Sequence, residues 1–348
     1  MRVALSPSSA LRRKLFGTLS AICAAGLLPT TVQANSVYEQ SGTYSVNVID
    51  QVWRDTSRNR DVPIKLRIPQ SERKLPVILF SHGLGGSTNS GKLWGEHWAS
   101  HGYIVIHVQH KGSDESVWQG KPGLDAAMSM KSAANPMQLI ERTRDIKFIL
   151  DSLTKRVATP GDHPLQYADL AHIGMAGHSF GAITTQAIAG QQMGPFGNRA
   201  ADARIGAAIA FSPSPSFRNT GGNPFAKIER PFFSMTGTLD GELPGGLGTA
   251  AVNRTKPFEM MPAGNKYLVV FKDADHMIFS GQNIETTTRS KQARNPASMS
   301  ADKHVIKAGN ALSIAFWNAY LKSDEAARNW LQKQAGEVLN YDDHFSSK

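Results

Sequence analysis

The sequence predicts a protein of the α/β class, with a mostly parallel sheet that is covered by helices on both faces. Two observations lead to this prediction. Short runs of consecutive apolar residues, such as 75–82 ("LPVILFSH") and 205–211 ("IGAAIAF"), are typical of strands buried on both faces. Segments with apolar residues at helical spacing alternate with these runs. No repeat and no low-complexity linker interrupts the pattern, so the mature chain is expected to form one domain.

About eight segments are predicted as strands. Residues 43–53 and 62–68 have the pattern of a hairpin whose turn lies between Asp55 and Asp61. The remaining strands are the continuous apolar runs at 75–82, 103–108, 172–177, 205–211, 231–237 and 266–271. In a parallel sheet of this kind, binding and catalytic residues lie just after the carboxyl ends of the strands.

Five segments are predicted as helices between or after these strands. They are 92–102, 137–153, 180–191, about 305–320 and about 324–336. The first is closed by Gly102, and the second follows Pro136 at a position that favours a helix start. The stretches 111–135, which contains Trp118, and 212–230 are predicted as loops, where substrate specificity or a partial lid would lie.

The first 34 residues have the order of an export signal. Four basic residues in 1–14 precede the apolar stretch 15–28, and Val32-Gln33-Ala34 fits a small-x-small cleavage site. An N-terminal membrane anchor is the alternative. We expect residues 1–34 to be removed, leaving 35–348 as a single catalytic domain that is periplasmic or secreted and not stably inserted in a membrane. The only cysteine, Cys23, lies inside this signal, so the mature chain would have no disulfide.

The net charge of the chain is +10. Its basic residues are scattered, without a long run after the signal, which predicts a solvated surface that attracts anionic cell surfaces or polymers. No motif for nucleic-acid binding accompanies them, so no nucleic-acid partner is expected. The sequence leaves the oligomeric state open.

The motif with the clearest chemistry is Gly177-His178-Ser179-Phe180-Gly181, a match to G-x-S-x-G. The pentapeptide alone is a weak signal, since Ser179 could be a serine in a glycine-rich turn. Its position directly after a predicted strand and before a predicted helix is the context of a nucleophile elbow. The glycines would allow strand and helix to approach closely around a sharp turn that exposes the hydroxyl.

A serine nucleophile needs a base and an acid that orients the base. His276 follows the last predicted strand, and Asp240 follows the strand before it. Both therefore fall where the chemistry of a parallel sheet is expected. Glu242, Asp273 and Asp275 are alternative acids in the same stretches, although Asp275 adjoins His276 and its side chain would point away from the ring.

An oxyanion hole is the remaining requirement. The backbone N–H of Phe180, after the candidate nucleophile, is one expected donor. The other is the N–H of Leu84, in the glycine-rich loop 82–86 after the strand 75–82. His82 would anchor this loop, and His178 would pack beside the elbow.

No metal or organic cofactor is expected. His97 and His101 have the i, i+4 spacing of zinc ligands, but the glutamate of H-E-x-x-H is missing, so a pair on a helix surface is the simpler interpretation. Gly246-x-Gly248-x-x-Ala251 resembles a dinucleotide fingerprint, but no strand leads into it.

These motifs resemble the α/β-hydrolase fold, and within it the dienelactone-hydrolase-like and platelet-activating-factor-acetylhydrolase-like branch. The resemblance covers roughly residues 40–335. The segments that carry it are "FSHGLGG" (80–86), "GYIVIHVQHKGSD" (102–114), "GHSFG" (177–181), "TGTLDGELP" (236–244) and "DADHM" (273–277). It implies Ser179, Asp240 and His276 as a catalytic triad, with Leu84 and Phe180 as oxyanion donors.

Two departures from the family pattern bear on function. Dienelactone hydrolases use a cysteine nucleophile, whereas this chain has Ser179, which implies a serine esterase. In the acetylhydrolases the acid can follow the sixth strand, but the loop "FSPSPSF" (211–217) has no carboxylate, which favours Asp240.

The expected function is hydrolysis of a small-molecule or lipid carboxylic ester through an acyl-enzyme, with short loops that favour small or medium acyl groups. A lipase or phospholipase, a polyester hydrolase, an acyltransferase, and a non-catalytic binding protein on the same fold remain alternatives.

Overall fold

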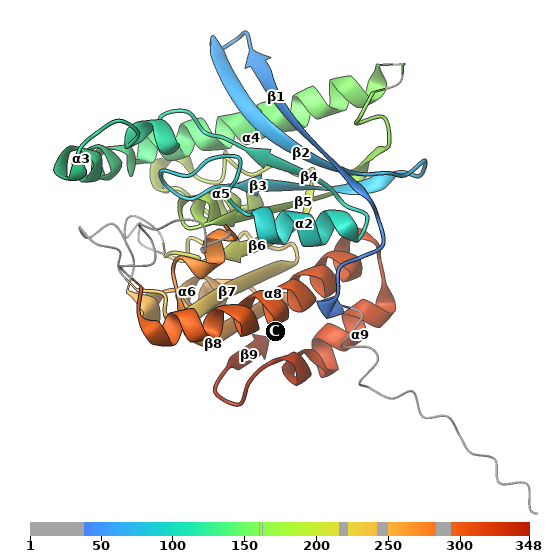
Figure 1. Cartoon of the computed structure of the whole chain (residues 1–348), viewed down its shortest axis with the longest axis vertical. Coiled ribbons are helices and arrows are strands. Elements are labelled where there is room, and N and C mark those ends of the chain that lie inside the picture. Colours follow the sequence, from blue (N-terminus) through green and yellow to red (C-terminus); the bar gives the residue numbers. More distant parts are fainter. Residues whose placement is uncertain (1–37, 160, 162, 216–221, 242–249, 283–293) are drawn as a thin grey trace, which may run out of the picture.

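Nine strands form one sheet in the order β1-β2-β4-β3-β5-β6-β7-β8-β9 (Figure 1). The computed structural model describes residues 38–159, 161, 163–215, 222–241, 250–282 and 294–348; the expected signal at 1–34 lies outside them. The strands are β1 (Val46–Asp55), β2 (Arg60–Pro69), β3 (Leu75–Ser81), β4 (Ile104–Val108), β5 (Ala168–His178), β6 (Ile205–Phe211), β7 (Phe232–Leu239), β8 (Lys266–Asp275) and β9 (His344–Ser347).

The α/β class and the mostly parallel sheet are as predicted from the sequence. The six strands from β4 through β3 to β8 are parallel, while β1, β2 and β9 pair antiparallel at the two edges. About eight strands were predicted, and the sheet has nine; the strand that was not predicted is β9. This edge strand has only four residues, "HFSS", and lacks the apolar run that reveals a buried strand.

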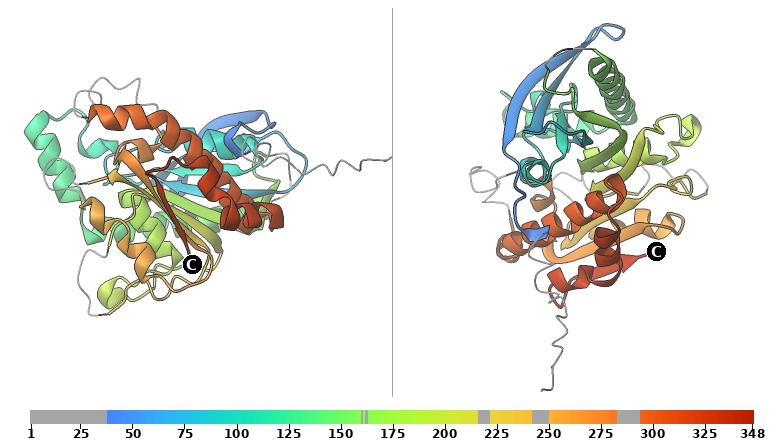
Figure 2. Two further views of the ribbon diagram at one scale, coloured as in Figure 1. Left: turned by 90° about the horizontal axis from the view of Figure 1, so that it is seen from below. Right: turned by 90° about the vertical axis from the view of Figure 1, so that its right-hand side faces the viewer.

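The helices cover both faces of the sheet. They are α2 (Lys92–Ser100), α3 (Gly123–Ala133), α4 (Pro136–Ala158), α5 (Phe180–Ala189), α6 (Lys256–Met260), α8 (Pro296–Leu321) and α9 (Glu325–Lys333). Short 3₁₀ turns lie at Glu115–Val117, Gly194–Phe196, Ala251–Asn253, Ile278–Ser280 and Ala335–Val338. In Figure 2, α8 (orange-red) and α4 (green) lie on different sides of the sheet.

The core has a separate apolar layer on each face. On one face, Trp94 and Trp98 of α2 and the apolar side of α8 pack against the central strands. On the other, α4 packs against β1 to β5. Asn135 caps α4 by accepting a hydrogen bond from the N–H of Gln138 at 3.0 Å, and Pro136 occupies the first turn.

One helix was missed in the polar stretch 111–135, which was expected to be a loop. Helix α3 projects at the edge of the molecule in both Figure 1 and the left view of Figure 2. Ala133 is its only buried residue, and its apolar side chains Leu124 and Met128 are exposed, so the helix packs no apolar face on the core. Among the described residues, no helix combines the length and the apolar character needed to cross a membrane.

Candidate active site

The carboxyl ends of the parallel strands meet at one edge of the sheet, and the predicted site residues lie there. Ser179 directly follows β5, Asp240 directly follows β7, and His276 directly follows β8. The loop that contains Leu84 begins after β3. Sheet order therefore brings together residues that are far apart in the sequence.

Ser179 occupies a sharp, strained turn between β5 and α5. Its backbone has φ 56° and ψ −114°, a conformation that a residue with a side chain rarely adopts. The Ser179 N–H donates to the carbonyl of Phe211 on β6 at 3.0 Å. A Cβ at Gly177 would collide with the carbonyl of Gly181, and one at Gly181 with the carbonyl of Ser81. The two glycines of the motif are thus required by the closeness of strand and helix.

Asp240 and His276 form a buried pair. The Nδ1 atom of His276 lies 2.7 Å from Oδ1 of Asp240, and the two residues are 4% and 0% exposed. The hydroxyl of Thr236 donates to the other carboxylate oxygen at 2.7 Å. Because a carboxylate accepts hydrogen bonds, Nδ1 carries the ring proton, which leaves Nε2 of His276 able to accept one.

Arg254 encloses this pair from the side of β6. Its Nε lies 3.1 Å from Oδ1 of Asp240, and its Nη2 lies 3.3 Å from Nδ1 of His276. Its Nη1 donates to the carbonyl of Ser212 at 3.0 Å and to the hydroxyl of Ser214 at 2.8 Å. Since Nδ1 already carries a proton for Asp240, the Arg254 contact with the ring is a proximity of charge and not a second hydrogen bond. Burial lowers the pKa of Arg254, while Asp240 opposes that shift.

His178 joins the elbow to the His276 loop. Its Nε2 lies 2.9 Å from the carbonyl oxygen of His276, and the two rings are 4.6 Å apart. Burial, with the nearby His276 and Arg254, lowers the pKa of His178 well below its usual value. His178 is therefore neutral and donates from Nε2, which agrees with the structural role expected for it.

Ser179 and His276 lie on neighbouring loops, but no hydrogen bond joins their side chains within the described part of the chain. Hydrogen bonds of this kind are often loose in the absence of substrate. Ser179 is partly exposed, as access by a substrate requires.

The loop after β3 borders Ser179. A Cβ built at Gly83 would lie 3.4 Å from Cβ of Ser179, and Leu84 packs against the apolar cluster that Leu139, Phe180 and Ile183 form. Phe180 directly follows Ser179 and is the first residue of α5, so its N–H lies at the N-terminus of that helix. Trp118 covers the loop, with its indole N–H donating to the carbonyl of Gly85 at 2.7 Å.

His82 fixes the start of that loop. The N–H of His110 donates to Nε2 of His82 at 3.0 Å, so the His82 proton must be on Nδ1, which lies 2.5 Å from the carbonyl of Gly83. Burial, with Arg142 close by, lowers the pKa of His82 well below its usual value. The neutral ring thus holds two backbone segments together.

Arg142 of α4 lies fully buried beneath the same loop. It donates to the carbonyl of His82, to the hydroxyl of Ser113 at 2.9 Å, and to that of Thr184 at 3.0 Å. Its guanidinium lies 4.7 Å from the ring centre of Phe180. Burial lowers the pKa of Arg142 to about 9, so it stays charged at neutral pH. One side chain therefore connects α4, the loop after β3 and α5.

A second set of serine, histidine and aspartate lies next to Arg142. Nε2 of His110 is 3.0 Å from Oγ of Ser81, and Nδ1 of His110 is 3.0 Å from Oδ2 of Asp145. All three residues are completely buried, and Arg60 binds both carboxylate oxygens of Asp145. Without access for a substrate, this set is a buried polar network that supports the loop.

The alternative acids do not contact His276 in the described structure. Asp275 binds Arg294 at 2.6 and 3.1 Å, so it points away from the ring as expected. Asp273 lies 3.5 Å from Lys272. Glu242 lies outside the described residues, as does most of the Gly246-x-Gly248-x-x-Ala251 stretch.

The interpretation of His97 and His101 as a surface pair was only partly right. His97 is buried, and its Nε2 lies 3.1 Å from the carbonyl of Tyr38, while Nε2 of His101 lies 2.9 Å from that of Gln40. Carbonyl groups of the N-terminal segment 38–42 contact these rings, and no local pattern predicts that contact between distant segments. Within the described ranges, no group of three or more His, Cys, Asp or Glu side chains is arranged to hold a metal.

Sequence reasoning missed Arg254, Thr236 and Arg142. No motif marks either arginine, because each acts on residues remote in the chain. The only signal was indirect: Arg142 lies among the apolar positions of the predicted helix 137–153, where a charged residue must find partners once buried.

The mostly parallel sheet with helices on both faces is the α/β-hydrolase fold. Residues 40–145 match the protein family described as platelet-activating factor acetylhydrolase, isoform II. This range includes the loop after β3 but ends before Ser179, Asp240 and His276. No curated protein matches the chain. Residues 40–145 are therefore similar to the platelet-activating-factor acetylhydrolases, and this similarity, together with the fold, favours a hydrolase.

Proposed function

We propose that this protein is a serine esterase that hydrolyses carboxylic esters through an acyl-enzyme. Ser179 is the nucleophile, His276 the general base and Asp240 the residue that orients the base. The N–H groups of Leu84 and Phe180 stabilise the oxyanion.

The observation that carries this proposal is the strained turn at Ser179 beside the buried Asp240–His276 pair. A backbone with φ 56° at a non-glycine residue is costly and is retained where it orients a functional group. The 2.7 Å contact with Asp240 fixes the tautomer of His276 that can accept a proton.

The reaction proceeds in two halves. Oγ of Ser179 attacks the carbonyl carbon while Nε2 of His276 takes the hydroxyl proton, and the oxyanion accepts hydrogen bonds from the two N–H groups. Collapse breaks the ester bond, and His276 gives its proton to the departing alcohol. Water then attacks the acyl-enzyme, His276 takes a proton from it, and collapse releases the acid and returns a proton to Ser179.

A fluorophosphonate probe tests the nucleophile. The wild-type protein should be labelled once and lose ester hydrolysis, and Ser179→Ala should neither be labelled nor turn over substrate. Asp240→Asn should keep the fold and lower kcat by about 10³–10⁴-fold, because the wrong tautomer of His276 is then favoured. Equal labelling of Ser179→Ala would contradict the proposal. An unlabelled, inactive wild type would favour a binding protein on this fold.

The family match favours a second, narrower candidate, namely removal of a short acyl group from a phospholipid. A panel of p-nitrophenyl esters from acetate to palmitate, a short-acyl phospholipid and a polyester film separates these substrates. Preference for the phospholipid would support the narrower reaction, and preference for the film a polyester hydrolase. An added alcohol acceptor distinguishes hydrolysis from acyl transfer.

A further inference from the structure

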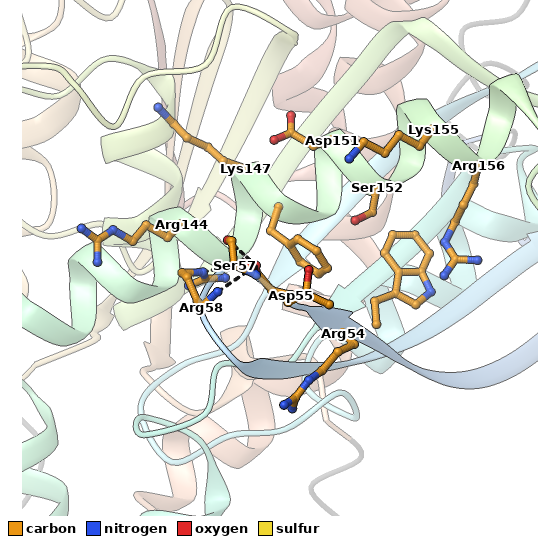
Figure 3. Close-up of a pocket in the computed structure, with 13 residues that line it drawn as sticks. Arg54, Asp55, Ser57, Arg58, Arg144, Lys147, Asp151, Ser152, Lys155 and Arg156 are labelled. Atoms are coloured by element: carbon orange, nitrogen blue, oxygen red, sulfur yellow. Dashed lines mark hydrogen bonds and ion pairs between the residues drawn. The ribbon is translucent and has the colours of Figure 1, made fainter.

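A cleft of about 830 Å³ lies between the end of the β1–β2 hairpin and one face of α4 (Figure 3). Ser179, Asp240 and His276 do not line it. Most of its polar side chains are basic. The cationic lining residues are Arg54, Arg58, Arg144, Lys147, Lys155 and Arg156, against the two acids Asp55 and Asp151.

Three of these cations are engaged by carboxylates of the protein. Arg54 binds Asp61 at 2.7 Å, and Arg144 binds Glu141 at 2.7 Å. Arg58 binds three acids, Asp55 at 2.5 Å, Asp145 at 2.8 Å and Glu141 at 3.1 Å, and so ties the hairpin to α4. These arginines build the cleft and have little charge left for a ligand.

The other three cations, Lys147, Lys155 and Arg156, form no ion pair within 4.0 Å with a carboxylate of the described residues. Lys147 is near enough to Asp202 to help lower the pKa of that carboxyl. Lys147 donates to the carbonyl of Arg199 at 2.8 Å, and the Arg156 guanidinium lies 4.4 Å from the ring centre of Trp53. Figure 3 shows all three projecting from the same helix. Asp151, between them, is bound by Arg204 at 2.7 Å.

The distance between the two cleft lysines of α4 favours an extended ligand. Lys147 and Lys155 are eight residues apart on α4, which separates them by about 12 Å along the helix axis. A single small anion cannot reach both. The hydroxyls of Thr56 and Ser152, on opposite walls of the cleft, add neutral donors for the oxygens of an anionic group.

Other anionic partners fit less well. Trp53 is only 2% exposed beneath Arg156, so it cannot stack on the bases of a single-stranded nucleic acid. The cations line the walls of a cleft, where the flat surface of a bilayer makes poor contact. We therefore propose that this cleft binds an extended polyanion that carries phosphate or sulfate groups along its chain, independently of the proposed esterase site.

Binding is tested by calorimetry of the full-length protein with short-chain polyphosphate and, separately, with a heparin oligosaccharide. We expect at least one to bind, with affinity that falls as salt rises. Binding of polyphosphate alone would identify a phosphate chain, and binding of heparin alone a sulfated glycan. The double variant Lys147→Glu/Lys155→Glu should weaken binding at least about tenfold, with ester hydrolysis unchanged.

The matched control is Lys303→Glu/Lys333→Glu, which makes the same change in net charge at exposed lysines of α8 and α9. Its affinity should stay within about twofold of the wild type, since these lysines lie outside the cleft. If both double variants lost the same affinity for the polyanion, binding would depend only on the net charge of the protein, and the proposal would be overturned. Failure of both polyanions to bind, or tighter binding of single-stranded DNA or anionic vesicles through the same lysines, would also overturn it.

Discussion

At the scale of single residues, the charge around His276 is set by two neighbours of opposite sign. The carboxylate of Asp240 lies 2.7 Å from Nδ1 of His276, and the guanidinium of Arg254 lies 3.3 Å from the same atom. Arg254 also holds the backbone after β6 through Ser212. It is therefore a positioning residue that also carries a charge, and the two effects can be separated by substitution.

Arg254→Gln removes the charge but keeps a side chain that can donate hydrogen bonds. Because Arg254 lies against Asp240 and holds the carbonyl of Ser212, we expect kcat to fall with KM little changed. Steady-state kinetics measure this loss. Arg254→Lys, which keeps the charge, should recover part of kcat. An unchanged kcat in Arg254→Gln would restrict Arg254 to a structural role.

At the scale of elements, α4 supports the site from below the sheet edge. Its Arg142 holds the carbonyl of His82, and its Asp145 holds His110, whose N–H in turn binds the ring of His82. The loop that contains Leu84 is thus attached to a helix that starts more than fifty residues later. Because these groups are buried, any one of them left unpaired is costly.

Arg142→Met should lower stability by about 3–5 kcal/mol, since several buried acceptors lose their donor. In the protein that remains folded, kcat should fall with KM little changed, because the loop loses its support and not its contact with substrate. Thermal unfolding and steady-state kinetics below the transition measure both effects. Arg142→Lys should recover part of kcat. Lost stability with an unchanged kcat would show that Arg142 supports the fold alone.

At the scale of the whole molecule, several histidines are buried in neutral form. Burial lowers the pKa of His107 to about 3, with a smaller contribution from the charge of Arg67. Burial likewise lowers the pKa of His110 to about 4, with a smaller contribution from the charge of Arg142. In the unfolded chain both return to about 6.5. Below pH 6.5 the unfolded chain therefore binds protons that the folded protein does not.

The free energy of unfolding should accordingly fall as the pH drops from 6.5 towards 4, by up to about 1.4 kcal/mol per pH unit for each such histidine. Urea unfolding at pH 7.5, 6.5, 5.5 and 4.5 measures this slope. His107→Gln should make this slope shallower by up to about 1.4 kcal/mol per pH unit, the contribution of one histidine. A stability that is flat below pH 6.5 would contradict the assignment of buried neutral histidines.

The sequence by itself determined the elements and the residues placed at their ends. Runs such as 205–211 and the elbow around Ser179 are local patterns, in which a strand, a turn and a helix follow one another without help from distant residues. The placement of Asp240 and His276 at one edge of the sheet could be predicted because each directly follows a strand, and parallel strands end at a common edge. The polar edge strand β9 and the exposed helix α3 carry no such pattern and were missed.

Only the tertiary structure decided which distant side chains meet. Arg254 reaches Asp240 and His276 across two loops, and Arg142 reaches the loop after β3 across about sixty residues. Basic residues that are scattered in the sequence gather in one cleft because α4 presents every third or fourth residue on the same side, facing the β1–β2 hairpin. Local patterns fix what forms along the chain, whereas these contacts depend on the order of strands in the sheet and on the packing of helices across it.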